Sequence, residues 1–136
     1  MDDLQKSMMV GVSGMKAQAQ RLRVISENLA NADSAATSAD GTPYRRKLIT
    51  FKDEIDRQTG INGVKVDKVR PDTSDFVKKY DPRHPAADKD GYVMMPNVNP
   101  LIEMMDMREA QRSYEANMNV VSTSKAMLAR TVDMLK

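Results

Sequence analysis

The residues that could take part in chemistry are few, and they are scattered along the chain. His84 is the single histidine among 136 residues, and it stands between Arg83 and Pro85 in a turn-like stretch. A general base must be held in place for proton transfer, and the sequence offers no second catalytic candidate beside this histidine. We therefore expect His84 to have a loop role rather than a catalytic one.

Two other patterns resemble catalytic motifs without completing them. Residues 11–14 read Gly-Val-Ser-Gly, but a nucleophile elbow needs a glycine at position 15, where this chain has methionine, and it must follow a strand. Asp53, Glu54 and Asp56 could be paired carboxylates, yet they alternate with basic residues as a solvated surface does. Neither pattern predicts an active site.

Asp88 and Asp90, followed by Gly91, resemble the start of a calcium-binding loop. A full loop needs further oxygen ligands and a glutamate at its twelfth position, which here is Asn99. The chain has no cysteine, which excludes disulfides and thiolate metal sites, and it has no glycine-rich phosphate cradle. We therefore predict a protein that is not an enzyme and that has no catalytic residue, no cofactor and no metal site.

The charge balance and the start of the chain exclude further classes. The 21 basic and 19 acidic residues give a net charge of +2, which is too even to indicate nucleic-acid binding. The densest basic cluster, Arg45-Arg46-Lys47, is interpreted as a solvated strand end. The acidic start does not resemble a secretory signal, and no run approaches the roughly 20 apolar residues that span a bilayer. Taken alone, these features predict a soluble cytoplasmic protein without membrane insertion.

Two amphipathic stripes, one near each end of the chain, are the elements that any function must use. Apolar residues recur every seven positions in both, which is typical of helices that pack against another helix. Helices over residues 4–32 and 100–135 would be roughly 43 and 52 Å long. In the first segment the repeat is Met8, Met15, Leu22 and Leu29, with Leu4, Gly11, Gln18, Ile25 and Ala32 between them. In the second it is Met107, Tyr114, Val121, Leu128 and Leu135, with Met104, Met118 and Val132 between them.

The rest of the chain is too poor in large apolar residues to cover both stripes. Burying one large aliphatic side chain contributes about 1.5–3 kcal/mol, whereas ordering the backbone of one residue costs about 1–2 kcal/mol. The middle can support a small sheet and no more. Three alternatives stay open: the helices pack on each other, they pack on neighbouring subunits, or they remain disordered until a neighbour arrives.

Residue types at the expected helix ends refine these boundaries. Asn31 can end the first helix because asparagine tolerates the left-handed conformation. Asn99 is a good cap for the second helix, and Pro100 suits its first position. Glu103 follows near the positive end of that helix, where the dipole favours an acid.

Two kinds of residue on the helices leave alternatives open. Gly11 and Gly14 each cost about 1 kcal/mol relative to alanine inside a helix. Either the first turns fray, or the glycines permit close approach to a neighbour or keep the segment unfolded for part of its life. The twelve methionines are either core filler or adaptable contacts for several non-equivalent partners.

The middle of the chain predicts a loop and a few short strands. Residues 33–43 are small and polar, as in a loop. Strands are expected over Tyr44–Phe51, Val64–Val69 and Phe76–Tyr80. The expected fold class is mainly α with a small β portion. It divides into an N-terminal helix (1–33), a linker with a small β-rich segment (34–98) and a C-terminal helix (99–136).

Three segments resemble the axial (rod and hook) proteins of the bacterial flagellum, most closely the proximal rod proteins of the FlgC type. The first starts at Ser13-Gly14-Met15 and ends in Asn28-Leu29-Ala30-Asn31. The second leads from Asp33-Ser34 to Pro43-Tyr44. The third includes Gly91-Tyr92-Val93 and Pro96-Asn97-Val98-Asn99, and its continuation is Ser113-Tyr114-Glu115-Ala116-Asn117. The motif positions are Asn28, Asn31, Pro43, Tyr44, Pro96, Asn97, Asn99 and Asn117. Asn28, Asn31 and Asn117 are expected to form hydrogen bonds near helix junctions, with capping as the alternative for Asn31.

The resemblance implies a structural subunit rather than an enzyme. Subunits of this family pair their terminal helices as an antiparallel coiled coil that lines a hollow axle, with a small β-rich portion toward the outside. They leave the cell unfolded through the flagellar type III export apparatus, without a cleaved signal peptide. The resemblance therefore replaces the cytoplasmic expectation by the periplasmic rod of the flagellar basal body.

On this basis we expect a proximal rod subunit of a hollow drive shaft that transmits motor torque and passes exported subunits. Its partners would be copies of itself, other proximal and distal rod proteins, and basal-body ring and export-gate adaptor proteins. The rival is a cytosolic coiled-coil adaptor or chaperone of an export system. The expected subunit-interface residues are Met8, Met15, Leu22, Ile25, Leu29, Met107, Tyr114, Met118, Val121, Leu128 and Leu135.

Overall fold

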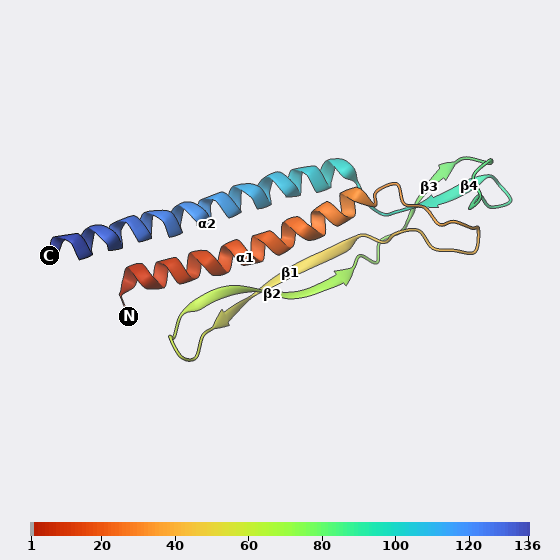
Figure 1. Cartoon of the computed structure of the whole chain (residues 1–136). Coiled ribbons are helices and arrows are strands. Elements are labelled where there is room, and N and C mark those ends of the chain that lie inside the picture. Colours follow the sequence, from red (N-terminus) through yellow and green to blue (C-terminus); the bar gives the residue numbers. More distant parts are fainter. Residues whose placement is uncertain (1) are drawn as a thin grey trace. The chain divides into compact units, whose positions relative to one another are not determined.

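The computed structural model describes residues 2–136, which form two long helices and four short strands (Figure 1). The expected fold class, mainly α with a small β portion, is therefore confirmed. In chain order the elements are α1 (Asp3–Ala30), β1 (Lys47–Ile55), β2 (Asn62–Pro71), β3 (Val77–Tyr80), β4 (Tyr92–Met95) and α2 (Pro100–Met134).

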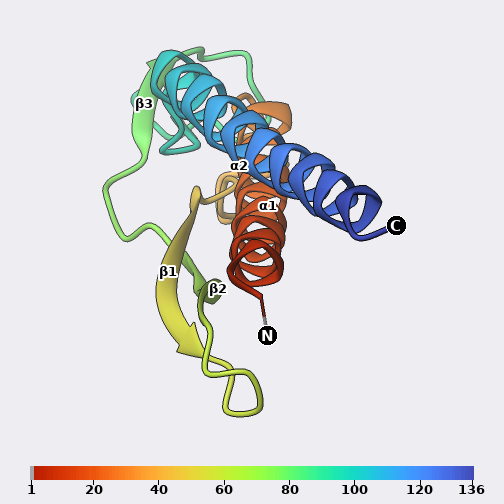
Figure 2. The same ribbon diagram turned by 90° about the vertical axis from the view of Figure 1, so that its left-hand side faces the viewer.

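The chain folds into two compact units, and each contains a part of both helices. Unit 1 contains the residues up to Leu22, Ile49–Lys68 and Arg108–Lys136, and unit 2 contains Arg23–Leu48 and Val69–Met107. Within unit 1, α1 lies between α2 and the hairpin of β1 and β2, as two perpendicular views show (Figure 1, Figure 2). Unit 2 holds the end of α1, the start of α2, and strands β3 and β4.

The start of α2 is the one that the sequence predicts. The side-chain oxygen of Asn99 accepts a hydrogen bond from the backbone N–H of Leu101 at 3.1 Å, and its carbonyl accepts one from Glu103 at 3.1 Å. Pro100 is the first helical residue, where its missing N–H leaves no hydrogen bond unmade. The predicted cap is confirmed.

α1 ends at Ala30, which confirms the predicted helix end near Asn31. The left-handed conformation expected of Asn31 is wrong, because within residues 2–136 only glycines have a positive φ. The backbone N–H of Ala32 instead donates to Leu29 in a tight turn, and the Asn31 side chain donates to the Glu27 carbonyl at 2.9 Å. The Glu27 carbonyl, which already accepts the Asn31 backbone N–H at 3.1 Å, thus accepts a second hydrogen bond from the same residue.

Each of the two sheets consists of two strands. β1 pairs with β2, and β3 pairs with β4 in an antiparallel register that places Tyr80 opposite Tyr92. The rings of these tyrosines meet edge to face with centroids 5.3 Å apart. β1 begins at Lys47 rather than at the predicted Tyr44, and β4 was not among the predicted strands.

The turn between β1 and β2 needs a glycine. Gly60 has a φ of +68°, and its N–H donates to the Asp56 carbonyl. The Asp56 carboxylate accepts the backbone N–H of Gln58 at 2.9 Å, and this hydrogen bond is the main cause that lowers the pKa of Asp56. The turn therefore favours an ionised aspartate at its first position.

The buried stripe of α2 is smaller and more polar than predicted. Glu103, Ala110 and Ser124 are buried, at spacings of seven and fourteen residues. The predicted stripe positions Met118 and Val132 are exposed, at 44% and 49%, and so remain available to a neighbouring subunit. Ala110 and Ser124 have short side chains, which let the helix backbones approach closely.

Candidate functional site

Asn28 is the centre of a buried polar cluster in unit 2. Its side chain is 1% exposed. The amide nitrogen donates to the Lys47 carbonyl at 2.9 Å, and the amide oxygen accepts from the Lys47 N–H at 2.9 Å and from the Tyr44 hydroxyl at 2.8 Å. The Asn28 side chain thus forms with the first residue of β1 the pair of hydrogen bonds that a neighbouring strand would form. Its loss would leave buried polar groups of the linker unpaired.

Glu103 and Arg46 form an ion pair in the same unit. The Glu103 carboxylate is 1% exposed in the first turn of α2, and the Arg46 guanidinium binds it through Nε. Nη1 of Arg46 lies 3.2 Å from the Asp72 carboxylate, and Nη2 lies 3.7 Å from Asp106. One guanidinium therefore joins the linker before β1, the residue after β2 and the start of α2.

The basic cluster Arg45-Arg46-Lys47 is engaged, so its interpretation as a solvated strand end is wrong. The Arg46 side chain is 20% exposed, and Lys47 forms an ion pair with Glu27 of α1. The Arg45 guanidinium donates to the Ser74 carbonyl at 2.9 Å and lies over the Phe76 ring, 4.1 Å from its centroid. These contacts are long-range, which a local sequence pattern does not reveal.

Asn97 completes the cluster from the segment that leads into α2. Its side-chain oxygen accepts the Arg46 backbone N–H at 2.7 Å, and its nitrogen donates to the carbonyls of Asp72 and Ser74, both at 3.1 Å. We call this cluster the polar junction; its members are Asn28, Tyr44, Arg46, Asp72, Asn97 and Glu103.

Titration of the polar junction favours the paired state. Burial, followed by the nearby carboxylates of Glu27 and Glu103, raises the pKa of the Tyr44 hydroxyl, so it stays protonated and donates to Asn28. Burial acts to lower the pKa of Arg46, but its hydrogen bonds to and attraction by Glu103 and Asp72 outweigh burial and raise it. The donors and charges of this cluster are therefore matched to one another, and what the cluster can do is hold chain segments in place.

The structure gathers most of the predicted motif residues in unit 2. Asn28, Tyr44 and Asn97 belong to the polar junction, while Pro43 and Pro96 are buried in the same unit. Asn99 and Asn31 serve the ends of the helices, as described above. Asn117 lies apart from them in unit 1, where its amide nitrogen donates to the Ser113 carbonyl at 2.9 Å.

Sequence reasoning missed three members of the polar junction, namely Arg46, Asp72 and Glu103. Glu103 was explained by the helix dipole alone, which accounts for an acid in a first turn but not for a buried one. One sequence signal could have indicated that Glu103 is buried. Glu103 lies seven residues before the small, buried residue Ala110, which places both on the same face of α2. Its partner, Arg46, is 57 residues away in sequence.

The helices of unit 1 run in opposite directions and come very close. A β-carbon added to Gly11 would lie 2.8 Å from Cγ2 of Val121 and 3.3 Å from the Asn117 carbonyl. Further along, Arg21 reaches Glu109 at 3.5 Å. The close-approach interpretation of the glycines therefore holds, and the neighbour is the chain's own second helix.

The predicted interface residues divide by exposure. Ile25 is buried, whereas Met118 and Leu135 are exposed, the latter at 83%. The others are half-buried and so retain contact area for a neighbour: Met8, Met15, Leu22, Leu29, Met107, Tyr114, Val121 and Leu128.

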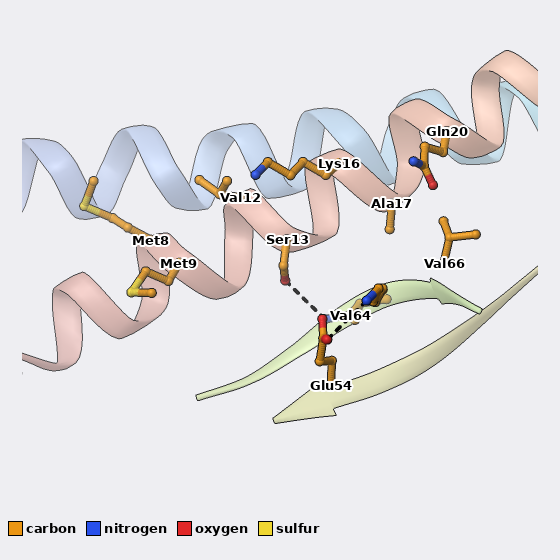
Figure 3. Close-up of a pocket in the computed structure, with 11 residues that line it drawn as sticks. Met8, Met9, Val12, Ser13, Lys16, Ala17, Gln20, Glu54, Val64 and Val66 are labelled. Carbon is orange, nitrogen blue, oxygen red and sulfur yellow. Dashed lines mark hydrogen bonds and ion pairs between the residues drawn. The ribbon is translucent and has the colours of Figure 1, made fainter. Parts of the chain in front are cut away.

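A groove of about 570 Å³ separates α1 from the β1–β2 hairpin in unit 1 (Figure 3). Met9 and Ser13 extend from α1 toward the hairpin, which contributes Val64 and Val66. The Ser13 hydroxyl donates to the Val10 carbonyl at 2.7 Å and accepts the Val64 backbone N–H at 3.2 Å. The hairpin is thus attached to α1 beside an open, mainly apolar groove.

The residues considered for chemistry have structural contacts. Nδ1 of His84 accepts the Ala86 backbone N–H at 3.0 Å, which agrees with a loop role. The Asp88 carboxylate accepts the N–H groups of Asp90 and Tyr92, both at 2.9 Å, and so closes a turn. Across residues 2–136, no three His, Cys, Asp or Glu side chains are grouped as a metal site requires. In the same part of the chain, neither helix has the length and hydropathy of a membrane span.

Both ends of the chain match families of flagellar rod proteins. The family described as flagella basal body rod protein matches residues 8–35, and the C-terminal family of the flagellar basal body rod FlgEFG proteins matches residues 89–134. These matches include most of α1, the last strand and α2. The fold and its terminal helices therefore define an axial protein of the flagellar rod.

Full-length relatives make the assignment specific. The chain is 50% identical over 136 residues to flagellar basal-body rod protein FlgC of Agrobacterium fabrum, covering 100% of this chain and 98% of the relative. It is 38% identical to the FlgC protein of Bacillus subtilis, with 96% and 97% covered, and 42% identical to that of Salmonella typhimurium, with 90% of each covered. The chain belongs to the FlgC family of flagellar basal-body rod proteins. This is a family of structural proteins and not of enzymes.

Proposed function

We propose that this chain is a proximal subunit of the flagellar rod, which polymerises with copies of itself and with sibling rod proteins. The product is a hollow drive shaft that transmits motor torque and leaves a channel for exported subunits. Membership of the FlgC family and the apolar surface of α2 support this proposal.

The observation that carries the proposal is the amount of apolar surface that α2 and the residue after it, Leu135, leave in water. Leu101, Met105, Met134 and Leu135 are 67%, 63%, 86% and 83% exposed. Burying such surface yields about 25 cal/mol per Å², so a neighbouring subunit gains by covering it. If α2 of one subunit contacts a different surface of the next subunit, the contact is head-to-tail. Contacts of this kind propagate as a helical assembly.

We further propose that α1 and α2 act in the rod as an antiparallel coiled coil. Support comes from the burial of Glu103, Ala110 and Ser124 at multiples of seven residues and from the close approach of Gly11 to Val121. Each half-buried stripe residue named above would then contact the partner helix with one part of its side chain and the next subunit with the other part.

The polar junction has a mechanical role in this proposal. It fixes the linker to the end of α1 and the start of α2, through Asn28 and through the pair of Arg46 and Glu103. A buried ion pair contributes little net stability but disfavours other arrangements, since breaking it leaves a buried charge. A torque-bearing subunit needs such a fixed geometry.

The remaining expectations concern place and partners. We propose the periplasmic part of the basal body as the location, reached by type III export of the unfolded chain without a cleaved signal peptide. Proximal and distal rod proteins, ring proteins and export-gate adaptors would be the neighbours. The small buried side chains of the described residues, such as Ala17 and Ala110, support a fold that is marginal until neighbours cover it.

Fractionation of cells that carry a tagged full-length chain tests the function. The proposal expects the chain, at its full uncleaved mass, in purified basal bodies. The rival adaptor would instead stay in the soluble cytoplasmic fraction, and that result would refute the proposal.

A surface variant sharpens this test. Met105→Asp, on the exposed face of α2, should lower incorporation into basal bodies strongly, because a carboxylate would have to be buried at a contact. Gln111→Asp adds the same charge at an exposed polar position and serves as the matched control. Equal incorporation of both variants would count against α2 as the assembly surface.

A further inference from the structure

The inter-helix stripe of α2 continues beyond the part that α1 covers. Leu128 is half-buried, whereas every residue from 129 to 136 is exposed. Val132 follows Leu128 at the spacing i+4, which keeps both on one helix face, and Leu135 lies in the turn directly after α2. Val132 and Leu135 are 49% and 83% exposed. Within residues 2–136, the stripe therefore runs on into residues that α1 does not cover.

The direction of the helices explains this overhang. Gly11 lies beside Val121, and Ser7 lies near Ser124, so positions on α2 rise as positions on α1 fall. If this pairing of positions continues, Asp3, the first residue of α1, lies beside residue 128 of α2. Residues 129–136 then extend past the start of α1.

The groove between α1 and the hairpin is an apolar surface of matching size. Its α1 wall runs from Met8 to Gln20, which spans roughly 18 Å of helix. The stretch from Leu128 to Leu135 spans roughly 10 Å. A volume of about 570 Å³ has room for several aliphatic side chains of such a stretch.

The chain cannot fill this groove with its own overhang. The groove begins at Met8 and runs toward Gln20, whereas the overhang leaves α1 in the opposite direction, past Asp3. A straight helix does not turn back over that distance. The segment and the groove can therefore meet only between two molecules.

We infer that residues 128–135 of one copy of this chain bind in the groove between α1 and the β1–β2 hairpin of a second copy. The inference rests on the proposed rod function and names the two surfaces that one such contact joins. Val132 and Leu135 would lie against Met9, Val64 and Val66. The overhang and the groove are different surfaces, so each copy donates a segment and receives one, and the contact propagates instead of closing a dimer.

Site-directed disulfide formation tests this contact, because the chain has no cysteine of its own. Leu135→Cys and Val64→Cys are made in two differently tagged full-length chains, which are expressed together. Basal bodies are purified and oxidised, and adducts are detected through both tags. Arg130→Cys, at an exposed position on the opposite face of α2 from Leu128, replaces Leu135→Cys as the control.

The expected result is an adduct of twice the chain mass from Leu135→Cys with Val64→Cys and little from Arg130→Cys. Met9→Asp in the receiving chain should lower the adduct yield about tenfold or more, because it places an unpaired carboxylate in the groove. Val10→Asp should leave the yield unchanged. These neighbours are equally exposed, at 41% and 40%, but Val10 does not line the groove.

Three results would overturn the inference while the rod function stands. Both chains could enter basal bodies and give no adduct although a small maleimide labels both cysteines. Arg130→Cys could cross-link as well as Leu135→Cys. The adduct of Leu135→Cys could have the mass of a different partner protein. Failure of the unmodified tagged chain to enter basal bodies would instead refute the proposed function, and this inference with it.

Discussion

Gly14 and Asn117 are in such close contact that a side chain at position 14 has no space. A β-carbon on Gly14 would lie 2.7 Å from the side-chain oxygen of Asn117 and 2.8 Å from its Cγ. The Asn117 amide is held in place by its hydrogen bond to the Ser113 carbonyl at 2.9 Å. The two helices of unit 1 therefore approach at a point where one contributes no side chain.

Gly14→Ala is expected to lower the free energy of unfolding by about 1–2 kcal/mol, although alanine favours helix by about 1 kcal/mol. The added methyl must displace Asn117 from Ser113. Thermal or urea unfolding of the purified chain measures the change. Asn117→Ala should relieve the clash, so Gly14→Ala should cost much less in that background. A Gly14→Ala variant more stable than the parent would show that the helices part easily.

Asn28→Ala is expected to destabilise unit 2 by about 2–4 kcal/mol, because the Tyr44 hydroxyl and both backbone groups of Lys47 lose a buried partner. Chemical unfolding followed by circular dichroism measures it. Asn119→Ala, at an exposed position of α2, should change stability by less than about 0.5 kcal/mol. Similar losses from both variants would argue against a special role of Asn28.

Stability should fall in acid as Asp72 becomes protonated. The backbone hydrogen bond from Ser74 is the main cause that lowers the pKa of Asp72 below 3.8, with a further contribution from Arg46. Because the folded pKa is the lower one, the unfolded chain takes up the proton first, so the contribution is complete above about pH 5 and is lost as the pH falls through the folded value.

Asp72→Asn should accordingly flatten the loss of stability between about pH 5 and pH 3. Unfolding curves at several pH values measure this slope. Asp75→Asn removes an exposed carboxylate nearby and is the control. A slope that Asp72→Asn leaves unchanged would exclude this residue as the source.

Leu128→Asp is expected to abolish assembly, because it places a charge in the stripe of α2 beside the start of α1. Swimming in soft agar, by cells whose only copy carries the variant, measures the loss. Ala126→Asp, on the opposite, exposed face, should permit swimming. Normal motility with Leu128→Asp would contradict the assembly role of this stripe.

The helices could be predicted because their signals are local. A seven-residue apolar spacing, Asn99 as a cap and Pro100 as a first residue gave α2 its start, and the FlgC-type motifs gave the family. The polar junction could not be predicted, because Arg46 and Glu103 meet only through the fold. The basic cluster looks solvated in sequence since its partners, Asp72 and Glu27, lie far from it along the chain.

The errors in the middle of the chain have the same origin. The expected strand began at Tyr44, but the Tyr44 side chain is used for Asn28, and regular pairing starts only at Lys47. The four residues of β4 are too few for an alternating pattern. For the exposed methionines the sequence left two alternatives open, because apolar spacing does not distinguish a contact with the same chain from a contact with another one.

The thioethers on the surface of α2 have a consequence for how the protein is damaged. Oxidation converts methionine into a polar sulfoxide, which disrupts apolar contacts. Before assembly such sulfurs are open to oxidants, and the affected side chains are Met104, Met105, Met118, Met127 and Met134. A chain oxidised at that stage would lose the surface by which it joins its neighbours, whereas burial would shield the same sulfur atoms. Oxidative stress would therefore act on flagella under construction and spare those already built.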